Sequence, residues 1–396
     1  MSLDGLAWLD ATRRLRIRGA DGTETPAFDG LTWGAWAEPA EQEVHSWPTW
    51  SPDGTRVASF RLARQDGAMA CHVRVTDVQG IDALEVCELT ERLPIYLQWS
   101  TDGTSLNILT QDGDLLILEQ AWLDAPGVLR RRLTGSPLFF QGARDALVAF
   151  VGETVDDRQR PPALIVLDDD GRRLQLAGVP GNFCAPVVLG DEVAYVRIDA
   201  GRPELHVAPL AGGPTRKLRS ADGLAALLPS PDGAKLAWSI APDGTGQAYH
   251  GIELIDPWTG LSETVTREHL VAFFWLPDGS GLITAQRTSD GTVAWSRVGL
   301  DGHTRVLGEV FPTRDLRFYL RFFEQFALSH PLLSPDGAHL VVPGGWVDRD
   351  DPRGTPRLWA IPVEGGEVEA IAEGVFATFA PATVPPWQEE VLDGDS

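Results

Sequence analysis

The sequence predicts an all-β fold, a single β-propeller built from four-stranded antiparallel blades. Three observations predict it: a turn motif recurs along the chain, its copies are spaced at the length of one blade, and short strand patterns fill the intervals. The motif is Ser-Pro-Asp-Gly or a close variant. It occurs at residues 51–54, 100–103, 230–233, 276–279 and 334–337.

Two weaker copies of the motif lie between the second and third clear ones. Asp145 and Asp191 each precede an apolar strand pattern, as the aspartates of the clear copies do. Successive copies are then spaced by roughly 40 to 60 residues, the length of a four-stranded propeller blade. The longest interval, between Asp278 and Asp336, contains an insertion at residues 311–326.

Each residue of the motif has a physical role in a tight turn. Proline fixes its own φ, aspartate accepts hydrogen bonds from nearby backbone amides, and glycine adopts the positive φ that closes the turn. Trp50, Trp99 and Trp275 lie next to the same point of their repeats. We expect these large rings to fill the space between neighbouring blades.

Short alternating strand patterns follow each motif. The Asp53 copy continues with Arg-Val-Ala-Ser-Phe, His-Val-Arg-Val-Thr and Leu-Glu-Val-Cys-Glu-Leu, and later copies repeat this order with turns such as Ala-Gly-Gly and Glu-Gly-Gly. Patterns of period two between turn residues indicate strands. Each repeat therefore predicts four short strands.

The two ends of the chain predict one further, composite blade. Residues 1–30 contain a pattern like the outer hairpin of the last full repeat, and residues 375–384 contain a pattern like the missing innermost strand. Pairing them would remove the open edges of the sheet. Residues 1–396 then form one propeller of eight blades. Seven is the alternative, if the N-terminal strands only complete an unfinished blade.

These repeats resemble the TolB-type propeller repeat, which centres on Ser-Pro-Asp-Gly followed by an apolar strand. The resemblance covers residues 44–60, 93–110, 224–240, 270–285 and 327–343. It implies the propeller fold. Similar repeats occur in the propeller domains of prolyl oligopeptidase and dipeptidyl peptidase relatives, but here the repeats use up the chain and leave no room for a hydrolase domain.

Charge and the N-terminal sequence narrow the partners and the location. The formal net charge is -23 and the sequence pI is about 4.7. Such a field repels nucleic acid and anionic membrane surfaces, so neither is an expected partner. The N-terminus has no apolar run of signal-peptide length, and we expect a cytoplasmic protein.

No motif of a known catalytic centre occurs in the sequence. A Gly-x-Ser-x-Gly elbow, a P-loop and a dinucleotide-binding Gly-x-Gly-x-x-Gly after a strand are all missing. We therefore predict no catalytic residue and no cofactor. Cys71, Cys87 and Cys184 are expected to be free buried thiols, with a disulfide between Cys71 and Cys87 as the alternative.

A metal site in the central channel is a weaker possibility. His45, His269 and His330 lie near predicted innermost strands, where some propeller lyases gather metal-binding histidines. Asp348 and Asp350 belong to an acidic loop that has oxygen ligands for a hard cation. Ordinary strand histidines and a solvated acidic loop are the simpler interpretations, so no metal ligand is predicted.

The insertion at 311–326 is the most distinctive candidate for partner binding. It predicts a helix starting near Thr313, whose apolar face is wider than one packing seam needs. In the simpler interpretation the helix only packs over the propeller mouth. In the functional interpretation it presents an aromatic surface, flanked by arginines, that binds a partner. The candidate residues are Arg314, Arg317, Phe318, Tyr319, Arg321 and Phe322, with Trp33, Trp36 and Trp346 from other loops.

The sequence thus favours a non-catalytic binding or scaffold propeller that recognises a protein or peptide. Its binding face is expected opposite the Ser-Pro-Asp-Gly turns, where the irregular loops lie. One alternative is a small-ligand or metal-dependent enzyme, a lyase or a glycan-active protein, that uses the central channel. The other is an accessory propeller that acts in trans with a peptidase, which rests on analogy.

Overall fold

The structure is a computed structural model of the whole chain. It describes residues 3–19, 43–65, 68–79, 82–144, 146–155, 158–178, 184–199, 202–220, 222–242, 248–347 and 353–381. These residues form many antiparallel strands and two short helices, α1 (Arg314–Arg321) and α2 (Phe323–Phe326). The all-β prediction is confirmed.

Three sheets each contain four strands in sequence order. The first contains β3 (Glu43–Trp50), β4 (Arg56–Gln65), β5 (Ala68–Asp77) and β6 (Ala83–Leu89). The second contains β15 (Val187–Leu189), β16 (Glu192–Asp199), β17 (Arg202–Pro209) and β18 (Arg216–Ser220). The third contains β19 (Leu224–Pro229), β20 (Leu236–Ala241), β21 (Tyr249–Ile255) and β22 (Ser262–Leu270).

One long sheet arises because a single strand pairs on both sides. It contains β7 (Leu93–Trp99), β8 (Ser105–Asp112), β9 (Leu115–Trp122), β10 (Leu129–Ala143), β11 (Ala146–Val155), β13 (Ala163–Asp168) and β14 (Arg173–Gly178), with β12 (Arg158–Gln159) beside β11. The first half of β10 pairs with β9 and the second half pairs with β11. Two four-stranded units are therefore joined through β10.

A second long sheet is joined in the same way through β26. It contains β23 (Ala272–Trp275), β24 (Gly281–Arg287), β25 (Val293–Gly299), β26 (Thr304–Pro312), β27 (His339–Trp346), β28 (Arg357–Pro362) and β29 (Glu369–Glu373). The last residues of β26 pair with β27. Leu333 forms an isolated bridge to Leu340, where the inner strand of a unit is expected.

The two ends of the described chain meet in one sheet. It contains β30 (Phe376–Phe379), β1 (Leu6–Leu9) and β2 (Leu15–Arg18), with β1 in the middle. The predicted pairing of segments from 1–30 and 375–384 therefore occurs within these ranges. Residues 20–30 and 382–384 lie outside the described residues.

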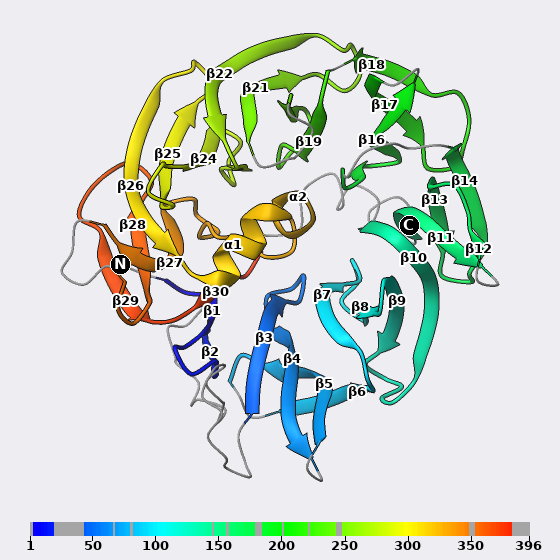
Figure 1. Cartoon of the computed structure of the whole chain (residues 1–396), viewed down its shortest axis with the longest axis horizontal. Coiled ribbons are helices and arrows are strands. Elements are labelled where there is room, and N and C mark those ends of the chain that lie inside the picture. Colours follow the sequence, from blue (N-terminus) through cyan, green and yellow to red (C-terminus); the bar gives the residue numbers. More distant parts are fainter. Residues whose placement is uncertain are drawn as a thin grey trace, which may run out of the picture.

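Figure 1 shows the sheets arranged in a ring, with α1 and α2 near its centre. First strands of neighbouring sheets contact one another, as β3 contacts β7 and β15 contacts β19. The insertion thus lies within the ring. No helix among the described residues is long and apolar enough to cross a membrane.

The Ser-Pro-Asp-Gly turns share one hydrogen-bond pattern. In the last copy, Ser334 Oγ donates to Asp336 at 2.5 Å, and Asp336 accepts from the backbone N–H of Ala338 at 3.0 Å. The Gly337 N–H donates to the Ser334 carbonyl at 2.8 Å, and its φ is 69°. Glycine is required here because positive φ strains residues with a side chain. The copies at 51–54, 100–103 and 230–233 repeat this arrangement.

The tryptophans beside the turns join neighbouring sheets. Trp99 Nε1 donates to the Thr49 carbonyl at 3.0 Å, and Trp275 Nε1 donates to the Leu228 carbonyl at 3.3 Å. Trp50 makes the same bond, to Thr378 of β30. Each indole therefore fills inter-sheet space, as expected, and also satisfies a backbone carbonyl of the preceding sheet. All three cysteines are buried and free.

Candidate functional site

The helix α1 is held at its first turn by residues from the closing sheet. Thr313 caps it, because Thr313 Oγ1 accepts from the Leu316 N–H at 3.1 Å and donates to the Val375 carbonyl at 2.8 Å. Asp315 forms an ion pair with Arg13 of the β1–β2 turn, with a shortest distance of 2.7 Å. Contacts with residues that are distant in sequence thus fix the position of the first turn of α1.

One face of α1 is buried in the ring. Leu316, Tyr319 and Leu320 lie on it, and the Tyr319 hydroxyl donates to the His330 carbonyl at 2.9 Å. Tyr319 was predicted to contact a partner, and this prediction is wrong, because its side chain is completely buried. The apolar spacing that singled it out is that of a core residue.

The helix α2 is hydrogen-bonded to sheets on different sides of the channel. The Gln325 amide donates to the Phe140 carbonyl at 2.6 Å and accepts from the Phe140 N–H at 3.1 Å, as a neighbouring strand would. Glu324 accepts from the Ala185 N–H and from the Tyr249 hydroxyl, both at 3.3 Å. The insertion therefore closes the channel like a plug.

Two titratable side chains, Glu324 in the plug and His330 just after it, have shifted pKa values. Burial raises the pKa of Glu324 to about 8, although the Cys184 thiol, the Ala185 N–H and the Tyr249 hydroxyl all favour its ionised form. Burial lowers the pKa of His330 to about 3. Both groups are therefore neutral at pH 7 in the folded protein. Burial also raises the pKa of the Cys184 thiol.

The histidines considered as candidate metal ligands make other contacts. The two ring nitrogens of His330 are hydrogen-bonded to Thr49 and Ser329, and His45 Nδ1 is hydrogen-bonded to Ser59 at 2.9 Å. His269 lies in the exposed outer strand β22 beside His250. Across the described ranges, no three His, Cys, Asp or Glu side chains come together as metal ligands would.

Two of the weaker candidates, Asp348 and Asp350, lie outside the described residues, as do Trp33 and Trp36. Trp346 is described and is buried, so it is not a partner contact as predicted. Its ring centre lies 5.5 Å from that of Trp359. Its indole also covers Gly308, where a Cβ would lie 2.1 Å from the ring. The pairing of β27 with β26 encloses this side chain.

The outward face of α1 carries the remaining candidates. Arg314, Arg317 and Arg321 are exposed, while Phe318 and Phe322 are partly buried. The Arg321 guanidinium lies over the Phe322 ring, 5.6 Å from its centre. None of these three arginines forms an ion pair with a described residue, although the protein is strongly acidic. We call these five residues the α1 surface.

An apolar cavity of about 240 Å³ adjoins the α1 surface. Phe318 and Phe322 line one side of it, and Ile95 and Leu116 line the other. Ile95 and Leu116 lie in the ends of β7 and β9 remote from the turn at 100–103, so this cavity opens on the face opposite the turns. The arrangement combines a place for an apolar side chain with adjacent positive charge.

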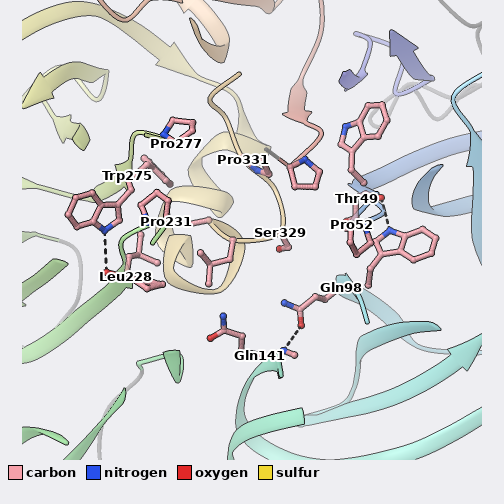
Figure 2. Close-up of a pocket in the computed structure, with 18 of the residues that line it drawn as sticks. Thr49, Pro52, Gln98, Gln141, Leu228, Pro231, Trp275, Pro277, Ser329 and Pro331 are labelled. Carbon is pink, nitrogen blue, oxygen red and sulfur yellow. Dashed lines mark hydrogen bonds between the residues drawn. The ribbon is translucent and has the colours of Figure 1, made fainter. Parts of the chain in front are cut away.

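A larger cavity of about 310 Å³ lies on the other side of the plug, on the turn face. Figure 2 shows Pro52, Pro231 and Pro277 of three turns around it, with Gln98 and Gln141 at one side. We call it the turn-face pocket. The binding face was predicted opposite the turns, and the sequence did not indicate this pocket. The repeat pattern does not show that the insertion leaves the turn-face end of the channel open.

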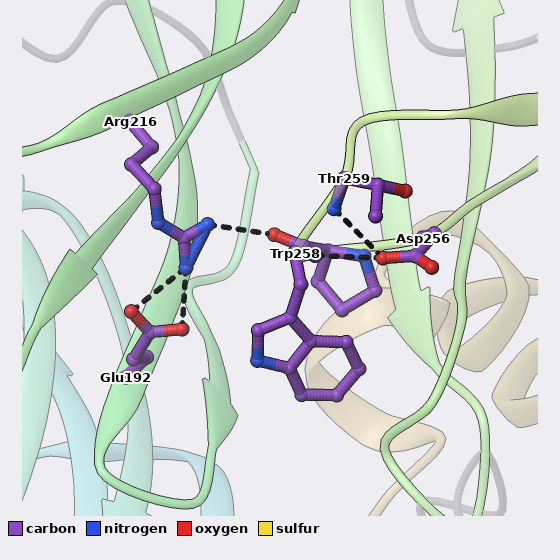
Figure 3. Close-up of polar contacts among 6 residues, drawn as sticks. Glu192, Arg216, Asp256, Trp258 and Thr259 are labelled. Atoms are coloured by element: carbon purple, nitrogen blue, oxygen red, sulfur yellow. Dashed lines mark hydrogen bonds and ion pairs between the residues drawn. The ribbon is translucent and has the colours of Figure 1, made fainter.

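An exposed tryptophan stands on the outer hairpin of the third four-stranded sheet. Figure 3 shows Trp258 beside Asp256, whose carboxylate accepts from the N–H groups of Trp258 and Thr259 at 2.8 and 2.9 Å. Arg216 braces this turn, since it donates to the Pro257 carbonyl at 2.9 Å and is paired with Glu192. The Trp258 side chain is 58% exposed. No cavity adjoins it among those described above.

Comparisons with solved structures identify the class of fold. The dihydro-heme d1 dehydrogenase NirN, solved in complex with DHE, has a TM-score of 0.55 and 12% identity, covering 96% of this chain and 75% of that chain. Oligogalacturonate lyase in complex with manganese has a TM-score of 0.53 and 16% identity, covering 79% and 87%. TolB from Acinetobacter baumannii is matched more loosely, with a TM-score of 0.37 and 15% identity over 83% of each chain.

The ring of antiparallel sheets and the likenesses to NirN and oligogalacturonate lyase define the chain as a β-propeller. Identities this low show the fold alone. No protein-family model matches the sequence, and no curated protein matches it. The resemblance to TolB-type repeats therefore remains one of repeat sequence.

Proposed function

We propose that this propeller is a binding module that recognises an acidic peptide segment of another protein through the α1 surface. The observation that carries the proposal is the set of three exposed arginines on one face of α1 that form no ion pair with any residue that the structure describes. The protein as a whole has a net charge of -23, so this local positive cluster is opposite in sign to the overall charge. Its chemistry matches carboxylates, which guanidinium groups bind in a bidentate manner.

The adjoining apolar cavity supports the same proposal. Peptide interfaces combine a buried apolar or aromatic anchor with polar contacts at the rim. Here Phe318 and Phe322 line the cavity of about 240 Å³, and Arg321 lies over Phe322. A peptide with an apolar side chain between acidic residues would satisfy both parts. Repulsion by the rest of the protein is screened beyond about 8 Å at physiological salt.

Residues 314–321 place these groups on one rigid element. Successive residues of a helix are separated by about 100° around its axis, so positions 314, 317, 318 and 321 share one side. The opposite side is anchored by Leu316, Tyr319 and Leu320. Because the helix already fixes the backbone that carries these side chains, little conformational entropy of the backbone would be lost on binding, which favours affinity.

The test is selection of ligands from a phage-displayed library of random nonapeptides on the folded protein. We expect recovered peptides that combine acidic and apolar residues. Replacement of Arg314, Arg317 and Arg321 by Ala together should weaken their binding at least about ten-fold, because charge-assisted hydrogen bonds contribute about 1.5–3 kcal/mol each. Dissociation constants measured by fluorescence polarisation give the result.

A matched control removes the same charge elsewhere. Arg172, Arg267 and Arg287 are also exposed, and their joint replacement by Ala should leave binding unchanged. Equal affinity of both triple variants for every acidic peptide recovered would contradict the proposal. A further check is salt: affinity should fall between 50 and 200 mM salt, because exposed charge pairs are screened.

We also infer that the propeller has eight blades. Three sheets supply one blade each, the two long sheets supply two each by division at β10 and β26, and β30, β1 and β2 supply the last. In this interpretation Leu333, bridged to Leu340, belongs to the inner strand of the seventh blade. An experimental structure with seven blades would overturn it.

A further inference from the structure

The turn-face pocket is lined by uncharged residues, although the protein as a whole is strongly acidic. Among its described lining residues there is no Asp, Glu, Lys, Arg or His. Its volume of about 310 Å³ is at the lower end of the range for ligand sites. A charged ligand would lose its hydration there without a compensating partner. The pocket therefore suits an uncharged group.

Two glutamine side chains supply the specific polar groups of this pocket. Gln98 Oε1 accepts from the Gly142 N–H at 3.2 Å, and Gln141 Oε1 accepts from the Val188 N–H at 2.9 Å. Each carbonyl oxygen is thereby fixed by the next four-stranded unit around the ring, because Gly142 lies in the second half of β10 and Val188 lies in β15. This fixes the amide orientation, so that each Nε2 remains as the free end.

The nitrogen ends have no protein partner among the described residues. No hydrogen bond involves Nε2 of Gln98 or Gln141, and Figure 2 shows both nitrogens directed toward the interior of the pocket. The Gln141 side chain belongs to a residue that is only 9% exposed. The pair is therefore arranged for a ligand that presents acceptor oxygens.

The walls distinguish a peptide from a sugar. Sugars stack on exposed aromatic faces, but Trp50 and Trp99 are buried between sheets, Trp275 is partly buried, and all three are bonded through Nε1 to neighbouring carbonyls. The walls also include the rings of turn prolines, such as Pro52 and Pro231. Proline rings and aliphatic groups pack against apolar side chains. A peptide combines such side chains with backbone carbonyl oxygens.

We propose that the turn-face pocket is a second binding site, for an uncharged, apolar peptide segment whose carbonyl oxygens accept hydrogen bonds from Gln98 and Gln141. The turn-face pocket lies on the opposite side of the plug from the α1 surface. It would bind a ligand of different chemistry. The propeller then binds on both faces, an acidic peptide on one and an uncharged peptide on the other.

The test uses Gln98→Glu and Gln141→Glu together. A carboxylate still accepts from the Gly142 and Val188 N–H groups, but it has no N–H to donate and repels a carbonyl oxygen. The probe is a phage-displayed library of random nonapeptides, selected on a variant that keeps the native turn-face pocket and carries the Arg314, Arg317 and Arg321 to Ala replacements on its α1 surface. We expect recovered peptides without charged residues, and at least about ten-fold weaker binding to the glutamate variant.

The control is Gln111→Glu, which makes the same chemical change in the cavity on the opposite face. It should leave affinity for these peptides unchanged. If Gln141→Glu lowers the melting temperature, Gln98→Met alone removes one donor without adding charge and should weaken binding by several-fold. Recovery of no uncharged peptide, or equal affinity for wild type and the glutamate variant, would overturn the proposal, whatever the result for the acidic peptides.

Discussion

At the scale of single residues, the turn aspartates tie the fold to pH. Asp336 accepts from Ser334 Oγ and from the Ala338 N–H, and these bonds hold its pKa below the ordinary value against partial burial. In the four other turns burial is the largest influence and would raise the pKa of Asp53, Asp102, Asp232 and Asp278. Hydrogen bonds nevertheless lower it.

A lowered carboxyl pKa stabilises the folded state above the unfolded pKa, about 3.9, and the contribution is lost as pH falls through the folded value. We therefore predict that the free energy of unfolding drops steeply below about pH 4. Asp336→Asn should cost about 1 kcal/mol at pH 7 and less at pH 3. Urea unfolding at both pH values measures this. A cost that does not change with pH would contradict it.

The pKa shift of Glu324 is opposite in direction to that of the turn aspartates, so its effect on stability depends on pH in the opposite way. Its folded pKa is about 8, whereas an unfolded glutamate ionises near about 4.3. The folded state therefore holds a proton that the unfolded state has released between these values. Stability from this group is complete below about pH 4.3 and is lost as pH rises through about 8.

Glu324→Gln should remove that dependence, because glutamine resembles the protonated acid. We expect similar stability of variant and wild type at pH 5, and a more stable variant at pH 9. Thermal unfolding across this range checks it, with the exposed Glu268→Gln as control. A wild-type protein whose stability is unchanged between pH 5 and 9 would show that the carboxyl is not held in its neutral form.

At the scale of elements, the tryptophans act as joints between sheets. Trp99→Phe keeps most of the ring but leaves the Thr49 carbonyl without its donor. We expect a loss of about 2 kcal/mol in the free energy of unfolding, from an unsatisfied buried acceptor and lost volume. Trp258→Phe, which changes an exposed ring, should cost less than about 0.5 kcal/mol. Equal losses of stability in the two variants would contradict the role of Trp99 in joining neighbouring sheets.

At the scale of the whole molecule, the pairing of β1 with β30 joins segments far apart in sequence. Phe379 is completely buried in this sheet, so Phe379→Ala should cost about 3–5 kcal/mol. Because neighbouring sheets pack on each other, we expect one unfolding transition at a lower urea midpoint. Early separate loss of the closing sheet, seen as a first transition in hydrogen exchange, would mean that the ring is not cooperative.

The sequence by itself determined the repeating unit. Turn chemistry acts over four or five residues, and strand alternation over the next ten, so residues such as Ser334, Asp336 and Gly337 reveal both without reference to the rest of the chain. The pairing of the two ends was also predictable, because each end carries an incomplete copy of the repeat. The helical character of the insertion at 311–326 was visible from the spacing of its apolar residues, although the structure divides it into α1 and α2 and assigns residues 311 and 312 to β26.

The tertiary structure alone decided where the insertion lies and which side chains it leaves available. Apolar spacing cannot separate the buried Tyr319 from the half-buried Phe318, because burial depends on which sheets surround the helix. The bond of Gln325 to Phe140 and the ion pair of Arg13 with Asp315 link residues that are distant in sequence. These contacts place the plug in the channel, and with it both cavities that the proposed binding sites use.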